Sequence, residues 1–499
     1  MLAKTKTCAV VGMDGHVVEV EVDISPGLPA FHIVGLPDLA VQESRERVRA
    51  AIRNSGAEFP MRRITVSLAP ADLKKSGPSY DLPIAVGILI SSGQLPNELG
   101  GSLLLGELAL DGALRSTRGI LPMVAIGRSE GYSNVFVPDV NAREASLVDG
   151  ITVIPAPGLE EVIAHVRDET TIPEFQESPE LASTDSCDDP RAPDLADVRG
   201  QEHAKRAVEV AAAGGHNLLM SGPPGSGKTL LARCLPSILP PMTDEESLEV
   251  TKIYSITGLL PEGSPLITHR PYRSPHYTIS NAGLVGGGQI PRPGEITLSH
   301  RGVLFLDELP EFGNSTLEVL RQPIEDKVVT ISRANGTVTY PANFMMVAAM
   351  NPCPCGYYGD QQKPCLCSPR TVSRYQRRIS GPMLDRMDIF VDVPRVEYDK
   401  LVAPPGDDAS LHVRERVTRA RALQRRRSRC RCFANVAAYA AGRGGDTPVQ
   451  VPLVALAGKR SFYVAAFSRC KRIGKARSVR SWGGGAWYAG GGAGSVNFV

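Results

Sequence analysis

The chain has 499 residues, of which 42% are hydrophobic and 22% charged, and its formal net charge is +2. This length predicts more than one domain, because single hydrophobic cores stop growing near about 250–300 residues. No apolar run is long enough to span a membrane and the N-terminal segment MLAKTKTCAV is not a secretory signal, so we expect no membrane partner and a cytoplasmic location. Ten cysteines in a chain of this size exclude a dense disulfide framework.

The charge is unevenly distributed. Between Leu411 and Val499 there are 18 lysines and arginines but only two acidic residues, Glu415 and Asp446. The preceding residues are therefore net acidic, and the basic character belongs to the tail and not to the folded body.

Residues 1–167 are interpreted as one α/β domain. Alternating apolar and polar residues predict strands at 17–22 and 64–68, and helical spacing predicts a helix at 40–54. An apolar helix is expected at 83–90, and short strands are expected at 135–138 and 151–154. Residues 168–193 are acidic and proline-rich, and we expect them to form a linker because they offer little surface to bury.

The N-terminal domain resembles the ribosomal-S5-domain-2-like fold that is shared with the proteolytic domain of Lon. The resemblance rests on Lys75-Ser76-Gly77-Pro78-Ser79, Gly106-Glu107-Leu108 and Arg118-Gly119-Ile120-Leu121-Pro122. In Lon-type proteases a lysine near the last of these segments activates the serine, but our alignment places Leu121 there, which cannot accept a proton. Ser79 is therefore expected to be structural and proteolysis is not expected.

A phosphate-binding loop is predicted in residues 194–400, the second domain. The sequence GPPGSGKT follows an apolar strand at 217–221 and leads into a helix, which is the context that distinguishes a phosphate loop from a surface turn. Its glycines let successive backbone N–H groups point toward a phosphate, the lysine reaches the β- and γ-phosphates, and the threonine ligates Mg²⁺. The nucleotide-binding residues are Gly222, Pro223, Pro224, Gly225, Ser226, Gly227, Lys228 and Thr229.

Acidic and amide side chains follow two further strands of the same domain. The apolar run 303–306 ends in Asp307 and Glu308, and the run 344–349 is followed by Asn351. In a doubly wound parallel sheet the ligand site lies at the carboxyl ends of the strands, so these residues belong beside the phosphate loop. We expect Asp307 to hold Mg²⁺, Glu308 to polarise the attacking water, and Asn351 to sense the γ-phosphate.

The set of motifs, completed by Leu384-Asp385-Arg386-Met387-Asp388, resembles the AAA+ ATPases of the branch that holds magnesium-chelatase ATPase subunits and MCM helicases. The resemblance implies that Arg386 projects into the ATP site of a neighbouring subunit, and a surface ion pair with Asp385 or Asp388 is the alternative. With AAMNPCPCG and the S5-like domain, residues 1–425 resemble the YifB/ComM group of magnesium-chelatase-like proteins. This resemblance implies a ring-forming, hexameric ATPase that uses ATP and Mg²⁺ and acts on branched or single-stranded DNA.

Two other functions stay open at this point. A chelatase-type ATPase would remodel a protein partner, although nothing in the chain resembles a porphyrin-binding subunit. A nucleotide-binding protein without hydrolysis would result if the C-terminal lid of the motor were lost. DNA-stimulated ATP hydrolysis distinguishes the motor from both.

Residues 327–341 are predicted to form a hairpin, with Asn335-Gly336 as its turn. Residues 281–294 form a second insert that is too glycine-rich for regular helix. The resembled helicases line their central pore with two such elements, so Lys327 and Arg333 are candidate DNA contacts. An ordinary packing hairpin is the alternative.

Four cysteines lie within fifteen residues as two C-x-C pairs, Cys353-Cys355 and Cys365-Cys367. Four thiolates can close a tetrahedral, structural Zn²⁺ site, and reduced structural thiols are the alternative.

The expected AAA+ lid is incomplete. Residues 401–430 begin a lid region, in which 411–427 read as a basic helix with Val413, Val417, Ala420 and Leu423 on an apolar stripe. Residues 431–499 are basic and of low complexity, and they lack helical patterning. We interpret this tail as the product of a shifted reading frame, with a disordered basic nucleic-acid-binding segment as the alternative, and no sensor arginine can be assigned in it. The expected fold is thus an S5-like α/β domain followed by an AAA+ doubly wound parallel sheet with an incomplete lid.

Overall fold

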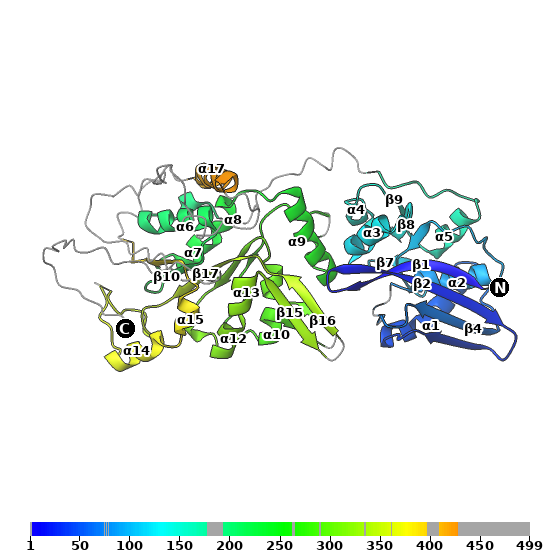
Figure 1. Cartoon of the computed structure of the whole chain (residues 1–499), viewed down its shortest axis with the longest axis horizontal. Coiled ribbons are helices and arrows are strands. Elements are labelled where there is room, and N and C mark those ends of the chain that lie inside the picture. Colours follow the sequence, from blue (N-terminus) through cyan, green and yellow to red (C-terminus); the bar gives the residue numbers. More distant parts are fainter. Residues whose placement is uncertain are drawn as a thin grey trace, which may run out of the picture.

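The computed structural model describes residues 2–73, 75, 77, 79–176, 193–261, 265–288, 291–333, 336–360, 362–396 and 409–427. Two bodies lie end to end along the long axis of the molecule, one built from residues 2–176 and the other from residues 193–427 (Figure 1). The predicted linker at 168–193 runs between them, and most of it lies outside the described residues, as does the predicted tail at 431–499.

The N-terminal body is a mixed α/β structure built on two main sheets. The four-stranded sheet has the order β1-β2-β4-β3, with β3 parallel to β4 and the other pairs antiparallel, and the three-stranded sheet has the parallel order β5-β8-β9. The strands are β1 (Ala3–Val11), β2 (Asp14–Ser25), β3 (Ala30–Val34), β4 (Arg63–Ala69), β5 (Ser102–Leu104), β6 (Glu107–Leu108), β7 (Leu114–Arg115), β8 (Asn134–Pro138) and β9 (Thr152–Ala156). The helices are α1 (Leu39–Asn54), α2 (Asp81–Ser91), α3 (Ile120–Ser129), α4 (Ala142–Ala145) and α5 (Leu159–Val166), with the 3₁₀ turn η1 (Asp139–Asn141). The likeness of this body to ribosomal S5 and Lon stays a prediction.

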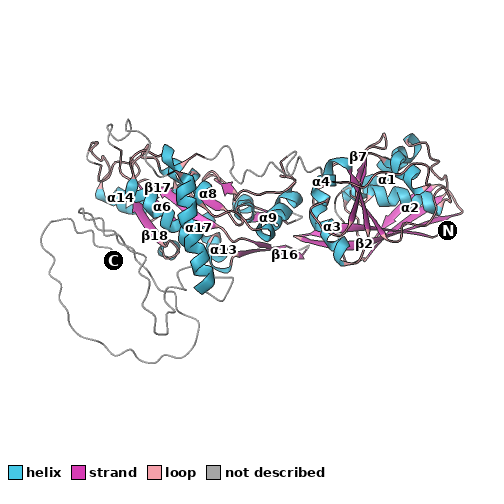
Figure 2. Ribbon diagram, turned by 90° about the horizontal axis from the view of Figure 1, so that it is seen from above, coloured by secondary structure: helices cyan, strands magenta, loops and turns pink. Residues whose placement is uncertain are grey.

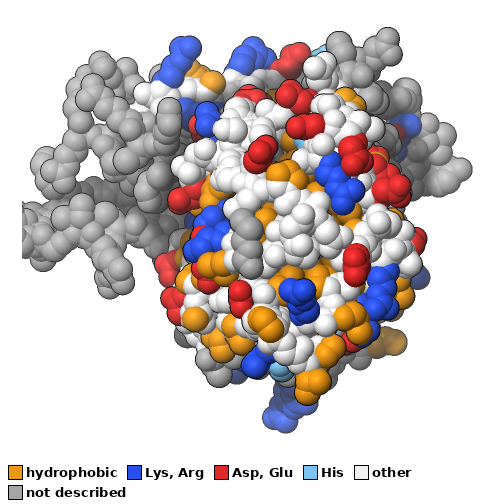
Figure 3. Space-filling model, turned by 90° about the vertical axis from the view of Figure 1, so that its right-hand side faces the viewer, with side chains coloured by type: hydrophobic (Ala, Val, Ile, Leu, Met, Phe, Trp, Pro, Cys, Tyr) orange, Lys and Arg blue, Asp and Glu red, His pale blue; other side chains and the backbone are white. Residues whose placement is uncertain are grey.

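Helix α2 forms the centre of this body, since every one of its residues is buried and it packs on β1, β2 and α1. The helix begins at Asp81, two residues before the predicted start. The carboxylate of Asp81 is buried and accepts a hydrogen bond from Arg47 Nε at 2.7 Å, which compensates the charge inside the core. Figure 3 shows the end of this body that faces away from the second one, where acidic, basic and hydrophobic side chains are interspersed.

The second body contains a five-stranded parallel sheet with the order β11-β14-β17-β10-β18. Ser221 pairs with Met350 and Leu306 with Ala348, so the segments after β10, β14 and β17 leave the same edge of the sheet. The strands of this body are β10 (Leu218–Ser221), β11 (Tyr272–Arg273), β12 (Gly286–Gly287), β13 (Arg292–Pro293), β14 (Val303–Leu306), β15 (Val328–Arg333), β16 (Gly336–Pro341), β17 (Met345–Met350) and β18 (Ile389–Asp392). The all-parallel arrangement agrees with the parallel sheet that the sequence predicts for this domain.

Helices cover both faces of the sheet and bury its apolar strands between two core clusters. One cluster joins the sheet to α6, α8 and α17, and the other joins it to α12, α13 and the hairpin β15–β16. The helices are η2 (Leu195–Asp197), α6 (Glu202–Gly214), α7 (Lys228–Arg233), α8 (Leu235–Ile238), α9 (Asp244–Thr257), α10 (Asn281–Val285), α11 (Glu295–Leu298), η3 (Leu309–Glu311), α12 (Asn314–Val319), α13 (Arg321–Asp326), α14 (Pro369–Gln376), α15 (Gly381–Leu384) and α17 (Ser410–Arg427).

Two sequence-based expectations are wrong in this body. Residues 281–285 form the short helix α10, although the insert was expected to be irregular, because the Ser280 hydroxyl accepts a hydrogen bond from Gly283 N and caps the helix. Helix α17 buries Val413 and Val417 as predicted, but Leu423 is 55% exposed. In this half of α17 the contact with α6 is made by Arg421 instead, whose guanidinium donates to the carbonyl of Ala212 at 2.6 Å.

The two bodies contact each other along α9 and the hairpin β15–β16 (Figure 2). Ser255 of α9 donates a hydrogen bond of 2.5 Å to the buried carboxylate of Glu144, and the Ser255 carbonyl accepts one of 3.1 Å from Gly119 N. At the other end of the contact, Val338 of β16 packs directly on Gly12, where a side chain would clash. Within the described part of the chain, no helix is both long and apolar enough to cross a membrane.

Candidate nucleotide site

The loop between β10 and α7 curls tightly around its own backbone. Gly225 has φ +74° and Gly227 φ +91°, values that L side chains rarely adopt. A side chain on Gly222 would collide with the carbonyl of Val393, so this position also requires glycine. Three glycines of the predicted phosphate loop, Gly222, Gly225 and Gly227, are therefore required by the local backbone geometry.

Lys228 is held inside this loop. Its side-chain Nζ donates to the carbonyl oxygens of Gly222 at 2.7 Å and Pro223 at 2.9 Å, and it lies 3.3 Å from Asn351 Oδ1. Lys228 is only 8% exposed, and burial lowers the pKa of its ammonium, against the opposing attraction of Asp307 and Glu308. The positive charge is thus bound by neutral oxygens, and an anionic phosphate group would be a stronger partner for it.

Thr229 and Asp307 meet beside the lysine. The Thr229 hydroxyl donates to Asp307 Oδ2 at 2.9 Å, while Asp307 Oδ1 accepts from the backbone N–H of Glu308 at 2.9 Å. A hydroxyl and a carboxylate are hard oxygen ligands of the kind that Mg²⁺ takes, so this pair fits the ion.

Glu308 follows Asp307 in the left-handed region at φ +54° and is exposed. A non-glycine residue in this region costs of order 1–3 kcal/mol and is typical of functional positions. The structure therefore brings Lys228, Thr229, Asp307 and Asn351 into one contact group, with the Glu308 carboxylate free to meet solvent next to it.

Two polar residues of this region escaped the sequence-based prediction. Gln201 has φ +61° and is buried, and its side-chain nitrogen donates to Ser226 O at 3.3 Å and to Pro394 O. Asn217 accepts from Met346 N at 3.0 Å and donates to the carbonyl of Arg386 at 2.9 Å. No motif indicates either role, because both side chains bridge segments that are far apart in the sequence.

Arg386 follows α15 and pairs with Glu325 of α13, and it also donates to the carbonyl of Pro382. Its side chain is 14% exposed. The ion pair differs from the alternative considered from sequence, which was Asp385 or Asp388. Asp388 instead accepts from Asn217 N at 2.8 Å, and this bond fixes the start of β18 beside β10.

The predicted DNA contacts occupy different environments on the hairpin. Lys327 caps α13 at the base of β15 with φ +59°, and burial lowers the pKa of its ammonium although Asp388 opposes the shift. This position does not favour contact with a phosphate backbone. Arg333 is exposed at the far end of β15, beside Gly287 of β12, so the hairpin meets the glycine-rich insert there. Asn335 of the predicted turn lies outside the described residues.

The four cysteines come together after β17. Their sulfur atoms all lie within 4.8 Å of one another, and Cys353 is buried while Cys355, Cys365 and Cys367 are half-buried. Hydrogen bonds from the backbone N–H groups of Tyr357 and Leu366 lower the pKa of the Cys355 thiol to about 6.

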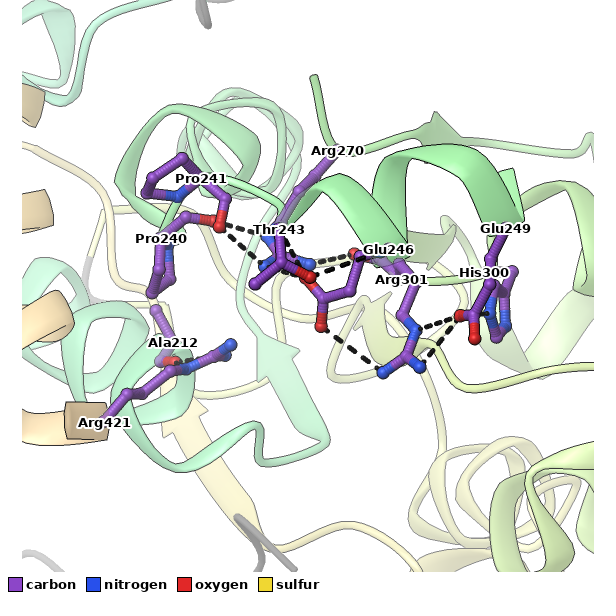
Figure 4. A network of polar contacts seen from close by, with 10 residues as sticks. All are labelled: Ala212, Pro240, Pro241, Thr243, Glu246, Glu249, Arg270, His300, Arg301 and Arg421. Atoms are coloured by element: carbon purple, nitrogen blue, oxygen red, sulfur yellow. Dashed lines mark hydrogen bonds and ion pairs between the residues drawn. The ribbon is translucent and has the colours of Figure 1, made fainter. Parts of the chain in front are cut away.

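A polar network supports the strand that carries Asp307 (Figure 4). Arg270 donates to Pro240 O at 2.6 Å, to Arg301 O at 2.6 Å and to Glu246 at 3.0 Å. Arg301 and His300, just before β14, both bond to Glu249 of α9, at 2.9 and 3.2 Å. The network fixes the entry of β14 against α9, the helix that contacts the N-terminal body.

In the N-terminal body, Ser79 is buried, and the nearby Lys75 is buried with its ammonium bonded to the carbonyl of Pro70. Leu121 is a core residue of α3, with its backbone N–H bonded to Glu144 at 3.0 Å. Leu121 offers no base to a serine, and the hydrogen bond of Lys75 to Pro70 gives that lysine a structural partner.

Comparison with known proteins identifies the family to which both bodies belong. Family models described as magnesium chelatase, subunit ChlI, match residues 194–401 and 20–141. These matches and the parallel sheet place the protein in the class of magnesium-chelatase-like AAA+ ATPases, which implies ATP and Mg²⁺ as its cofactors.

Relatives that match most of the chain identify the family within this class. The chain is 47% identical over 422 residues to an uncharacterized protein of Mycobacterium tuberculosis, covering 84% of this chain and 82% of that one. It is 43% identical to YifB of Escherichia coli over 436 residues (85% and 83%) and 43% identical to the competence protein ComM of Haemophilus influenzae over 434 residues (86% and 83%). The chain belongs to the YifB/ComM family.

Proposed function

We propose that this protein is an ATP-driven, ring-forming motor that acts on branched or single-stranded DNA. The observation that carries the ATPase part is the contact group of Lys228, Thr229, Asp307 and Asn351, which lies at the carboxyl ends of three neighbouring parallel strands.

Each residue of the site has a defined task in this proposal. Lys228 binds the β- and γ-phosphates, while Thr229 and Asp307 hold Mg²⁺, which neutralises charge on the phosphates when bound. Glu308 accepts a proton from the attacking water, and Asn351 orients the water or the γ-phosphate. Arg386 of a neighbouring subunit stabilises the transition-state charge, which makes self-association a requirement for turnover and supports a ring, which we propose to be a hexamer.

DNA as the substrate is supported by the exposed Arg333, where the β15–β16 hairpin meets the glycine-rich β12–β13 ribbon. A guanidinium at the end of a hairpin can follow a phosphate backbone without reading its sequence. A structural Zn²⁺ at the four cysteines is the third cofactor of the proposal.

ATP hydrolysis by the full chain tests the proposal when it is measured without DNA, with single-stranded DNA and with a four-way junction, with Lys228→Ala as the inactive control. Stimulation by DNA supports the motor. If the rate of ATP hydrolysis is the same with and without DNA, the result favours the chelatase-type alternative. The match to the magnesium-chelatase family model supports that alternative. Nucleotide binding without turnover identifies a protein that is inactive in hydrolysis.

A further inference from the structure

The sulfur atoms of Cys353, Cys355, Cys365 and Cys367, here called the cysteine cluster, are spaced as the ligands of one metal ion. Cys353 and Cys355 lie 3.3 Å apart, Cys353 and Cys365 3.7 Å, and Cys355 and Cys365 3.6 Å. A tetrahedron of thiolates with Zn–S bonds of about 2.3 Å has edges of about 3.8 Å. The same distances are far longer than the roughly 2.05 Å of a disulfide bond.

The backbone around the cluster has the tight turns that a metal knuckle needs. Gly356 has φ +84° and donates its N–H to the carbonyl of Cys353 at 2.9 Å, and Gly359 has φ +79°. In the second C-x-C pair, the N–H of Cys367 points at the sulfur of Cys365 at 3.4 Å. Hydrogen bonds of this kind orient the ligands of metal sites. Four sulfur ligands with no open position are typical of structural zinc.

The segment that carries the cysteine cluster also contacts the phosphate loop of the nucleotide site. Cys353 follows Asn351 by two residues, and Gly356 lies so close to the phosphate loop that a Cβ on it would stand 2.5 Å from Cδ of Pro224. On the other side, the second C-x-C pair leads into α14, whose Gln376 donates to the carbonyl of Pro352 at 3.3 Å.

We propose that the cysteine cluster binds one Zn²⁺ and that this ion couples the conformation of the phosphate loop to that of Asn351. The metal closes the chain between residues 353 and 367 and presses its first turn against Pro224. Loss of the ion releases that turn. The phosphate loop and Asn351 are then no longer held by the same segment. This inference rests on the proposed nucleotide site but not on DNA as the substrate.

Zinc content and nucleotide affinity of the full chain, purified without chelator, test the inference together. Elemental analysis is expected to find one zinc per chain in the wild type and in Cys8→Ala, and much less in the double variant Cys365→Ser/Cys367→Ser. Titration with a fluorescent ADP analogue is expected to show binding weakened by roughly 5-fold to 150-fold in the double variant, the usual range for two coupled sites.

Absence of stoichiometric zinc, or loss of zinc with unchanged nucleotide affinity, would overturn the inference. If the double variant does not fold, Co²⁺ exchanged into the wild type tests the site instead, because tetrahedral thiolate coordination produces characteristic absorption bands and their absence contradicts the site. Lys228→Ala is expected to bind nucleotide more weakly and to keep zinc. The two proposals can also fail separately. If the chain binds zinc and its nucleotide affinity depends on zinc, but DNA does not stimulate ATP hydrolysis, the DNA motor is excluded and the zinc inference is supported.

Discussion

The side-chain nitrogen of Lys228 lies 3.3 Å from Oδ1 of Asn351, which joins the phosphate loop after β10 to the end of the neighbouring strand β17. The contact brings a charged group and an amide side by side at the edge of the sheet. A nucleotide phosphate that binds there would meet both groups at once, so phosphate binding by the loop and sensing by β17 are expected to be inseparable.

Replacing Lys228 by alanine is expected to weaken nucleotide binding by about 10-fold to 150-fold, because a hydrogen bond to a charged group contributes about 1.5–3 kcal/mol. Titration with the fluorescent ADP analogue measures the effect, and circular dichroism checks the fold. Lys252→Ala on α9 serves as the matched lysine control. Equal affinities of the two variants would contradict the role of Lys228.

The variant Glu308→Gln is expected to bind ATP as the wild type does but to hydrolyse it about 10²-fold to 10⁴-fold more slowly, the usual contribution of a general base. The amide keeps the size of the side chain and removes its ability to accept the proton. Steady-state phosphate release gives the rate, with Glu311→Gln, three residues further on, as the control. A rate within a few-fold of the wild type would exclude Glu308 as the base.

Arg386 is paired with Glu325 within its own chain, and in the proposed ring it must exchange this partner for the nucleotide of a neighbour. Arg386→Ala is expected to abolish hydrolysis while leaving nucleotide binding intact. Glu325→Gln removes the competing ion pair and is expected to favour ATP-dependent assembly by up to about 5-fold, since such a partly exposed pair contributes at most about 1 kcal/mol.

Mixing inactive subunits tests whether this arginine acts between chains. Arg386→Ala and Lys228→Ala are each expected to be inactive alone, but a mixture of the two would contain interfaces with an intact loop on one side and an intact arginine on the other. Partial recovery of hydrolysis in the mixture is expected. If no mixing ratio restores turnover, Arg386 does not act between subunits.

Substitution of Arg333 by alanine is expected to weaken binding of single-stranded DNA and to lower the salt dependence of binding by about one counterion. Fluorescence anisotropy at several salt concentrations measures both. Arg53→Ala, an exposed arginine on α1 in the N-terminal body, is the control. Unchanged affinity and slope would remove the hairpin from the DNA interface.

Stability is expected to fall in acid because of Glu249. The hydrogen bond from His300, supported by Arg301, lowers the pKa of Glu249 to about 2 from its ordinary value near 4.5. A carboxylate with a lowered pKa stabilises the fold above about pH 4.5, and this contribution is lost as the pH falls toward 2. Burial lowers the pKa of His300, so its protonation below about pH 6.5 disfavours the fold in the same direction. Urea unfolding from pH 7 to pH 3 is expected to show a smaller loss for Glu249→Gln than for the wild type, whereas the exposed Glu245→Gln should follow the wild type.

The nucleotide site could be predicted closely because its residues are consecutive or directly follow apolar strands. Gly222 to Thr229, Asp307 and Asn351 follow local rules: glycines stand where φ is positive or where another backbone segment comes close, and polar residues stand where parallel strands end. The partners of Arg386 and Asn217 could not be predicted, since Glu325 and Met346 are brought to them only by packing of the sheet and its helices. The prediction that Leu423 is buried was wrong for a related reason. Helical periodicity indicates which side of α17 is apolar but not how far a neighbouring helix extends along it.

The hydrogen bond from Asn217 to the carbonyl of Arg386 has a consequence for how neighbouring subunits of the proposed ring would coordinate ATP hydrolysis. Asn217 precedes β10, the strand that leads into the chain's own phosphate loop, and Arg386 is the residue that we propose to act on the next subunit. In the proposed ring, a shift of β10 on nucleotide exchange would reach Arg386 through this one hydrogen bond. The state of one nucleotide site would then influence hydrolysis at the next site of the proposed ring.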